Sequence, residues 1–389
     1  MKIANRMEQL SPSLTLAITA LGRELKAQGK DILSFSAGEP DFDTPQIVKD
    51  AAIKAINEGQ TKYTAVEGII KTKQAIINKL KKDHNLDYKL EGIVISNGAK
   101  HSLFNLCQVL IENGDEVIIP SPYWVTYPEQ VKYSGGVPVF IETDETTNFK
   151  ITPEQLKKAI TPKTKILMLN TPSNPTGSIY SKEELTAIGK VLEGTDIIVF
   201  SDEMYEKIIF NGKKFTAAAE VSADMYNRTV TINGLSKAVA MTGWRFGYVA
   251  TPNVALAKAM TKLQGQVTSN INTMTQYAAI PALEGEADKD IEMMRAEFEK
   301  RKDYIVKAIN EIDGLSCYEP DGAFYVFINI KKISNDSMKF CADLLEQKGV
   351  ALVPGLAFGM EGYARFSFAT SLEVIKEGVK RIKEFTQNK

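Results

Sequence analysis

The sequence holds few of the side chains that most often carry catalysis. Its 389 residues include two histidines, His84 and His101. Two histidines leave no His-rich zinc site and make a histidine-based triad or proton relay a poor prediction. If the protein performs acid–base chemistry, we therefore expect a side chain other than imidazole to carry it.

Cysteine is also scarce. Cys107, Cys317 and Cys341 show no C-x-x-C spacing, which fits a reducing cytoplasm better than a disulfide framework. The N-terminal segment carries charges such as Arg6 and Glu8 and lacks the apolar core of a signal peptide. No run of about 18 uncharged apolar residues predicts a membrane span. We therefore expect a cytoplasmic protein with no membrane partner.

An excess of charge of either sign is absent. The chain has 47 Lys plus Arg against 48 Asp plus Glu, a net charge of −1, so nothing predicts a nucleic-acid partner. Apolar residues make up 44% and charged residues 24%, as in ordinary globular proteins rather than disordered, collagen-like or coiled-coil chains. At about 150 residues per domain, the length predicts two or three domains.

The middle of the chain alternates apolar strand-like runs with helical segments, among them 100–111, 153–160 and 181–192. The runs are continuous in Ile, Val, Leu and Phe, which is typical of strands buried on both faces. We therefore expect a doubly wound α/β fold with a large, mostly parallel sheet. Its predicted strands are Gly92–Ser96, Glu116–Pro120, Val137–Glu142, Lys165–Asn170, Asp196–Ser201 and Thr229–Asn233.

The composition changes after about residue 285. Residues 286–311 predict a long charged amphipathic helix, and 371–386 a last helix. Between them lie short predicted strands: Ala323–Ile330, Val350–Val353 and Ala364–Phe368.

The N-terminal segment, with a predicted amphipathic helix over 12–29, needs a partner, because neither chain end alone has much core. We expect a large domain over 46–285. A smaller, discontinuous α+β domain then consists of 1–45 plus 286–389.

Polar segments follow the predicted strands, and ligands of open α/β sheets bind beyond the carboxyl ends of strands. Taken singly, each has a plainer explanation: a lysine is usually exposed, Asn-Pro-Thr-Gly forms turns, and Asp202 suits a helix cap. No strand is followed by G-x-G-x-x-G, which argues against a dinucleotide-dependent dehydrogenase. The convergence of the segments is the evidence for a site; they are NGAK (97–100), SPYW (121–124), TPSNPTG (171–177), DEMY (202–205) and GLSK (234–237).

Together these segments resemble the fold type I pyridoxal-phosphate (PLP) aminotransferases, and within them the bacterial-type aspartate aminotransferases of class I, subgroup Ib. The matching segments run in the family's order and span most of the chain. They are SAGEPDFDTP (36–45), TKYTAVEGI (61–69), SNGAKHSLFN (96–105), SPYW (121–124), NTPSNPTG (170–177), SDEMYE (201–206), SKAVAMTGWRFGY (236–248) and ARFSFATS (364–371).

The resemblance implies roles for the residues that match. Lys237 is expected to bind PLP covalently and, once freed by substrate, to move the proton, which would explain the scarcity of histidine. Asp202 is expected to pair with the pyridine nitrogen and keep the ring an electron sink. Asn174 and Tyr205 would hydrogen-bond the ring's phenolic oxygen, and Trp124 would stack on the ring.

The phosphate of PLP is expected at the start of a helix, at Gly98, Ala99 and Lys100, where backbone N–H groups and the helix dipole favour an anion. Arg245 would add a charged fork.

The resemblance also implies a homodimer, in which Tyr63 reaches the phosphate of the neighbouring subunit. One departure concerns the phosphate site: several branches of the family carry a serine three residues before the lysine, where this chain has Gly234. Ser236, adjacent to the lysine, is also assigned to cofactor binding.

Arg365 is expected to bind the substrate α-carboxylate in two-bond fashion, near the Gly38 backbone, Asn174 and Trp124. A second cation for a side-chain carboxylate is expected in Lys100. The hydroxyl-bearing residues Ser13 and Thr15 match the family positions that accompany it.

The expected activity is that of an aspartate aminotransferase, which passes an amino group from L-aspartate to 2-oxoglutarate in two half reactions, with no metal. Broader aminotransferases of the family (aspartate–prephenate, aromatic or alanine) remain alternatives, as do a PLP lyase or synthase, because fold does not fix the reaction. A PLP-dependent transcription regulator is disfavoured, since the chain has no basic stretch.

Overall fold

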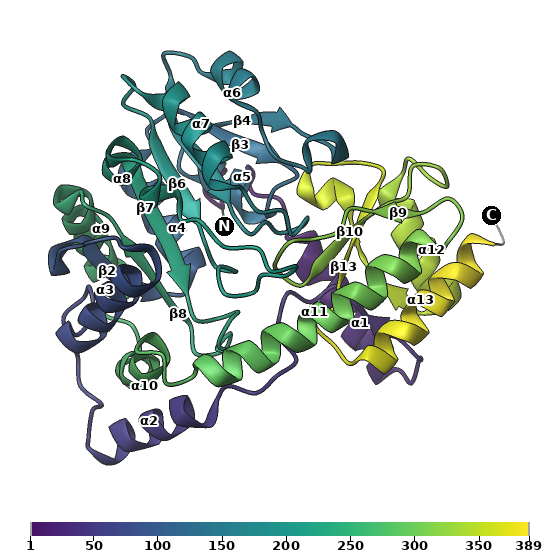
Figure 1. Cartoon of the computed structure of the whole chain (residues 1–389), viewed down its shortest axis with the longest axis horizontal. Helices are drawn as coiled ribbons and strands as arrows, with labels where there is room; N and C mark the ends of the chain where they lie inside the picture. The colour runs from purple at the N-terminus through teal and green to yellow at the C-terminus, as the bar shows by residue number, and fades with distance from the viewer. Residues whose placement is uncertain (1, 388–389) are drawn as a thin grey trace.

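The computed structural model describes residues 2–387, and its main sheet has seven strands in the order β2-β8-β7-β6-β5-β3-β4 (Figure 1). All neighbouring strands are parallel except β8, which runs antiparallel to both β2 and β7. The strands are β2 (Ile93–Asn97), β3 (Glu116–Ser121), β4 (Val137–Glu142), β5 (Thr164–Asn170), β6 (Ile198–Asp202), β7 (Thr229–Gly234) and β8 (Phe246–Ala250).

Helices cover both faces of this sheet, which explains its continuous apolar strands. Apolar residues of α4, α5 and α9 pack on one face, and those of α2, α3, α10, α6, α7 and α8 pack on the other. The doubly wound α/β fold is thus confirmed. The helices are α2 (Gln46–Asn57), α3 (Ile70–His84), α4 (Ala99–Leu110), α5 (Thr126–Tyr133), α6 (Pro153–Ala159), α7 (Lys182–Leu192), α8 (Ala223–Arg228), α9 (Val254–Val267) and α10 (Thr273–Leu283).

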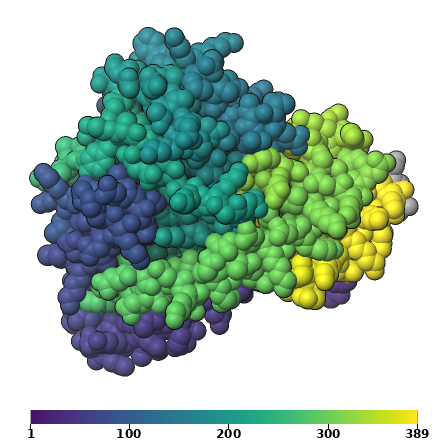
Figure 2. Space-filling model, viewed as in Figure 1, coloured from purple at the N-terminus to yellow at the C-terminus, as the bar shows by residue number. Residues whose placement is uncertain are grey.

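A second group of elements forms a four-stranded sheet, in the order β12-β13-β10-β9, and a separate parallel pair of β1 with β11. The long helix α11 extends from the main sheet to this group, and in Figure 2 it forms a continuous band along the lower surface. The elements are α1 (Leu14–Ala27), β1 (Leu33–Ser34), α11 (Asp288–Asn310), β9 (Ser316–Cys317), β10 (Tyr325–Asn329), α12 (Ser337–Lys348), β11 (Val350–Ala351), β12 (Val353–Pro354), β13 (Tyr363–Ser367) and α13 (Leu372–Thr386).

The N-terminal segment contacts both groups of elements. Leu33 and Ser34 of β1 pair with Val350 and Ala351 of β11, which joins the two ends of the chain. Farther upstream, the Ser11 backbone N–H donates a hydrogen bond to Glu129 Oε2 on α5 at 2.6 Å.

Strand β8 and helix α12 are among the elements that were not predicted from the sequence. Strand β8 is short and follows the turn-like sequence Thr-Gly-Trp-Arg, so its apolar run was absorbed into the preceding motif. Helix α12 has clear end signals, since the Asp336 side chain accepts from the Lys339 N–H and Gly349 adopts a left-handed conformation after its last turn. These two end residues would have located the helix.

Within residues 2–387, no helix is long and apolar enough to cross a membrane. The three cysteines are free and buried.

Candidate active site

A cavity of about 410 Å³ opens where the carboxyl ends of the main sheet meet α1 and β13. Its size lies within the range of small-molecule sites. Most of the residues that line it have polar or charged side chains. The lining residues are Ser13, Thr15, Leu16, Thr19, Arg23, Ala37, Gly38, Glu39, Ala99, Lys100, Trp124, Val125, Tyr127, Asn170, Asn174, Asp202, Met204, Tyr205, Ser236, Lys237, Thr242, Arg245, Tyr325 and Arg365.

Asp202 is the last residue of β6 and lies beside Asn170 at the end of β5. Its buried carboxylate accepts hydrogen bonds from the Tyr127 hydroxyl at 2.6 Å and from the Met204 N–H at 3.3 Å. Burial raises the pKa of Asp202 to about 6, and these two bonds and the cation of Lys237 oppose that rise. A cationic ring nitrogen brought to this carboxylate would favour its ionised form.

Lys237 lies three residues beyond β7, and its Nζ donates to the Gly38 carbonyl oxygen. Burial and, after it, the cation of Arg365 lower the pKa of Lys237 to about 8, with the carboxylate of Glu39 acting in the opposite direction. An amine with this pKa keeps a sizeable neutral, nucleophilic fraction near pH 7. Lys237 can therefore act as a nucleophile and as a base.

Arg365 is a fully buried guanidinium on β13. Its Nη1 donates to Asn174 Oδ1 at 2.9 Å and its Nη2 to the Ser36 carbonyl oxygen at 2.6 Å. The guanidinium carbon lies 4.4 Å from the ring centre of Tyr325. Its Nε is buried without a hydrogen-bond partner among the described residues, and no carboxylate neutralises the group. A carboxylate arriving in the cavity would supply the missing charge.

At another wall, Gly98 precedes helix α4 with a φ of +83°. A Cβ on Gly98 would lie 2.6 Å from Arg245 Nη2, so only glycine lets this guanidinium approach the helix start. Arg245 itself has a φ of +58°, a strained conformation of the kind that concentrates at functional sites. The first N–H groups of α4, on Ala99 and Lys100, have no partner within the helix.

Lys100 and Trp124 form a further part of the wall, with Lys100 Nζ 4.9 Å from the Trp124 ring centre. Burial and the nearby cation of Arg245 lower the pKa of Lys100. Helix α1 and the residue before it contribute Ser13 and Thr15.

The cavity brings together most of the residues that the sequence singled out. Gly98 lies directly behind the wall, against Arg245. Tyr63 lies outside the cavity and is 91% exposed. The predicted residues that line the cavity are Ser13, Thr15, Gly38, Ala99, Lys100, Trp124, Asn174, Asp202, Tyr205, Ser236, Lys237, Arg245 and Arg365.

Sequence reasoning missed Tyr127, which bonds Asp202, and Tyr325, whose hydroxyl lies 2.9 Å from that of Tyr205. Tyr127 follows Trp124 by three residues, and its N–H donates to the Trp124 carbonyl in the first turn of α5. That spacing would have placed both rings on one side. Tyr325 comes from a distant strand, and no local signal marks it.

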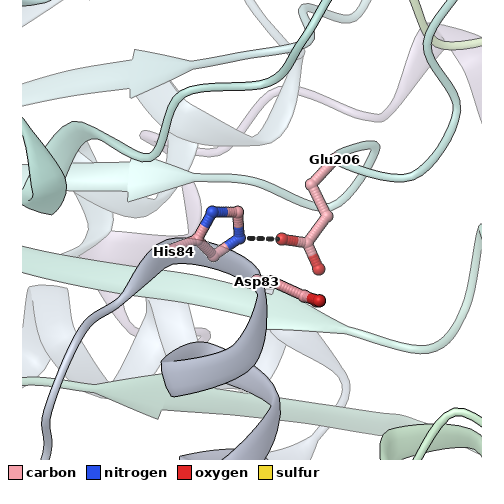
Figure 3. Close-up of side chains that lie close together, drawn as sticks. All are labelled: Asp83, His84 and Glu206. Carbon is pink, nitrogen blue, oxygen red and sulfur yellow. Dashed lines mark hydrogen bonds and ion pairs between the residues drawn. The ribbon is translucent and has the colours of Figure 1, made fainter.

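Outside the cavity, Asp83, His84 and Glu206 lie close enough together to suggest a metal site (Figure 3). Cations already neutralise its carboxylates: Lys79 Nζ contacts both Glu206 and Asp83, and Lys207 Nζ lies 2.7 Å from Asp83. Because the ammonium groups of Lys79 and Lys207 occupy the place where a metal ion would bind, Asp83, His84 and Glu206 belong to an ion-pair network.

Comparisons with known proteins agree with this geometry. The profile of the family "Aminotransferase class I and II" matches residues 30–382. An aspartate aminotransferase of Bacillus subtilis (strain 168) is 49% identical, over 100% of this chain and 99% of the relative. An aspartate/prephenate aminotransferase of Nitrosomonas europaea is 48% identical, over 98% of this chain and 99% of the relative.

Solved structures give the same result. The aspartate aminotransferase of Rhizobium meliloti has a TM-score of 0.96 at 40% identity, covering 100% of this chain and 99% of that one. That of Thermus thermophilus with maleate has a TM-score of 0.95 at 39% identity, covering 99% of both chains. The chain belongs to the class I and II aminotransferase family.

Proposed function

We propose that the chain is an aspartate aminotransferase that transfers the amino group of L-aspartate to 2-oxoglutarate, giving oxaloacetate and L-glutamate, with PLP as cofactor. One observation carries the proposal. A single cavity holds the amine of Lys237, the buried carboxylate of Asp202 and the unneutralised guanidinium of Arg365, in a chain 49% identical over its full length to an aspartate aminotransferase.

The donor set of the cavity fits PLP. The Asp202 carboxylate offers a partner for the ring nitrogen, and the Trp124 side chain offers an aromatic face. Arg245 and the start of α4 offer cationic and N–H groups to a phosphate. When bound, PLP supplies an electron sink that stabilises negative charge on the carbon being deprotonated.

Lys237 would hold the cofactor covalently and be released when substrate binds. Its amine would then accept the proton of the substrate Cα and return it on the cofactor side. The lowered pKa of Lys237, about 8, suits both directions, because the proton affinity lies close to the working pH. No histidine is needed, since the chain's two histidines are absent from the cavity wall.

Arg365 would bind the substrate α-carboxylate with N–H groups that are free of acidic partners, while Asn174 holds its guanidinium in place. Asp202 would stay ionised beside the protonated ring nitrogen. Lys100, with Ser13 and Thr15, would bind the side-chain carboxylate, which favours dicarboxylic substrates.

The test is spectroscopic. Purified protein reconstituted with PLP is mixed with L-aspartate, and the visible absorbance of the cofactor is followed together with oxaloacetate formation. We expect conversion to the amine form of the cofactor and release of oxaloacetate. Absence of any spectral change with every dicarboxylic amino acid would refute the aspartate assignment.

A second candidate is an aspartate/prephenate aminotransferase, favoured by the 48% identical relative of that name. A panel of amino donors and oxo-acid acceptors that includes prephenate separates the two. Oxo-acid formation also separates an aminotransferase from a PLP lyase or synthase.

We also propose a homodimer in which Tyr63 reaches the phosphate of the neighbouring subunit. Tyr63 and the nearby apolar residues Ile53, Ile56 and Ile70 are exposed in the single chain, which favours burial against a second copy. Sedimentation would measure the assembly, and the mutation Tyr63→Phe should weaken PLP binding.

The proposed domains are 46–285 and 1–45 plus 286–389, supported by the pairing of β1 with β11. A cytoplasmic location remains a prediction, and the free, buried state of the cysteines is compatible with it.

A further inference from the structure

The segment 202–206 presents side chains to opposite sides. Asp202 and Tyr205 line the cavity. Glu203 and Glu206 are absent from the cavity wall: Glu203 accepts a hydrogen bond from Ser201 of β6, and Glu206 faces His84 of α3 (Figure 3). Because one short segment carries both pairs, whatever fixes the two glutamates also restricts Asp202 and Tyr205.

Glu206 is held at both oxygens by helix α3. Its Oε1 accepts from Lys79 Nζ, and its Oε2 lies 2.9 Å from His84 Nε2. His84 Nδ1 lies 3.3 Å from Glu220 Oε2 on the other side of the imidazole ring. The far-side cluster, as we name it, consists of Lys79, Asp83, His84, Glu203, Glu206, Lys207 and Glu220.

Glu203 is fixed by neutral groups. Its Oε1 accepts from Ser201 Oγ at 2.7 Å and from the Ala218 N–H at 3.2 Å, while its buried Oε2 has no partner among the described residues. The remaining groups around the far-side cluster are the phenols of Tyr88 and Tyr248, the hydroxyl of Thr231 and the ring of Phe215, 5.4 Å from His84.

Stability alone does not explain such a network. Buried ion pairs give little net stability compared with apolar side chains of similar size, although removing one partner leaves a costly unpaired charge. What the network does supply is directional bonds at several points of the segment 202–206. The pKa of Asp202 responds chiefly to burial, to the bonds from Tyr127 and Met204 and to the cation of Lys237. The network's hydrogen bonds and ion pairs, which act on the segment itself, point to a geometric influence on Asp202.

We propose that the far-side cluster is a positioning device for the cofactor site: Lys79 and His84 on α3 hold Glu206, and thereby keep Asp202 and Tyr205 at their places in the cavity. This inference rests on the proposed PLP-dependent function. Glu206 and His84 are positioning residues, since neither reaches the cavity.

The experiment measures PLP affinity by equilibrium titration of the apoprotein, below the melting temperature of every variant, together with the pH profile of the visible absorbance after reconstitution. Glu206→Gln and His84→Leu should raise the dissociation constant of PLP about tenfold, as expected for a coupling between two sites, and displace the midpoint of the pH profile. His84→Gln should stay near wild type, because its amide can still donate to Glu206.

Two controls on α3 separate positioning from stability. Ile76 lies in the hydrophobic core beneath α3, so Ile76→Val lowers the stability of the protein without touching the far-side cluster. Lys81→Met removes an exposed ion pair, in which Lys81 Nζ lies 2.7 Å from Asp87 Oδ2. Both should keep the wild-type PLP affinity. If Glu206→Gln does not fold, Glu203→Gln replaces it, and its PLP affinity and pH profile are compared with those of the wild-type protein in the same way.

The inference is overturned if Glu206→Gln and His84→Leu lower the melting temperature, as Ile76→Val does, but keep the wild-type affinity for PLP and the wild-type pH profile of the absorbance. Failure of the wild-type protein to bind PLP overturns the proposed function instead, so the two failures are distinguishable.

Discussion

The cavity and the far-side cluster are two gatherings of buried charge on either side of the same segment, and they differ in how that charge is balanced. In the far-side cluster, carboxylates and cations neutralise one another directly, as between Lys79 and Glu206. In the cavity, Arg365 has no carboxylate partner among residues 2–387, and Asp202 bonds a phenol instead of a cation. Unbalanced buried charge is costly, so its presence marks the place where ligands are to supply the counter-charges.

The pKa values show the same contrast. In the cavity, burial dominates, raising the pKa of Asp202 to about 6 and lowering that of Lys237 to about 8. In the far-side cluster, ion pairing overcomes burial at His84, whose pKa rises, and at Glu206, whose pKa falls. Glu203, which neutral groups hold, is the exception in this cluster, because burial raises its pKa to about 7. Asp202 and Lys237 can therefore exchange protons near neutral pH, whereas the ion-paired His84 and Glu206 keep their charges.

The largest effect should come from removing the amine of the cavity. Lys237→Ala should lower aminotransferase turnover about 1,000-fold, the scale of general acid–base catalysis, because the variant loses the buried amine whose pKa lies at about 8. Stopped-flow absorbance with L-aspartate measures the loss. Exposed Lys214 provides the control, since Lys214→Ala should keep full turnover; equal losses in both variants would contradict the assignment.

Next in size is the unneutralised guanidinium. Arg365→Lys should raise the KM for aspartate about 100-fold, because charge-assisted hydrogen bonds are worth roughly 1.5–3 kcal/mol each and an ammonium cannot reproduce the planar fork. Arg381→Lys, in an exposed ion pair with Asp31, should leave steady-state kinetics unchanged. An unchanged KM in Arg365→Lys would place the α-carboxylate elsewhere.

A smaller and more selective effect is expected at the cavity edge. Lys100→Met should raise the KM for aspartate about fivefold, since an exposed charge pair contributes roughly 1 kcal/mol. Turnover of alanine, which has no side-chain carboxylate, should be the same in Lys100→Met as in the wild-type protein. Parallel kinetics with both donors provide the check, and equal losses for the two would argue for a role at the phosphate instead.

The smallest effect concerns the pH dependence of the far-side cluster. The pKa of His84 is raised to about 9 by its bonds and ion pairs with Glu206 and Glu220, against the opposing influence of burial. The contribution of protonated His84 to the free energy of unfolding is therefore fully present below pH 6.5, and it is lost as the pH rises through about 9. The melting temperature of wild-type apoprotein should exceed that of His84→Gln by about 2 °C at pH 6, with the gap closing by pH 9.5.

Glu203, whose pKa burial raises to about 7, titrates in the same range. Glu203 is present in both the wild-type protein and His84→Gln, so the difference between their melting temperatures reports the contribution of His84 alone. A gap that widens toward alkaline pH would show that His84 is neutral in the folded protein.

The central sheet was predictable because its strands are continuous apolar runs such as 165–170, which need no distant information to be recognised. Strand β8 was missed because antiparallel pairing with β2 and β7 is decided by neighbours on the sheet, not by its own five residues. At the site, Lys237, Asp202 and Arg365 were found through motifs. Tyr325 was missed because only the folding of β10 against β13 brings it to Arg365.

What the sequence alone indicated is the chemistry available: in a chain with two histidines, we expect another group to move protons, and the motif around Lys237 predicts which one. What only the tertiary structure decided is which charges stay unpaired. Arg365 and Glu206 are both buried ionisable residues, and the local sequence does not show which of them is paired with an opposite charge. Within the described part of the chain, the fold brings Lys79 and His84 to Glu206 and no acid to Arg365. This distribution of partners distinguishes the cavity from the far-side cluster.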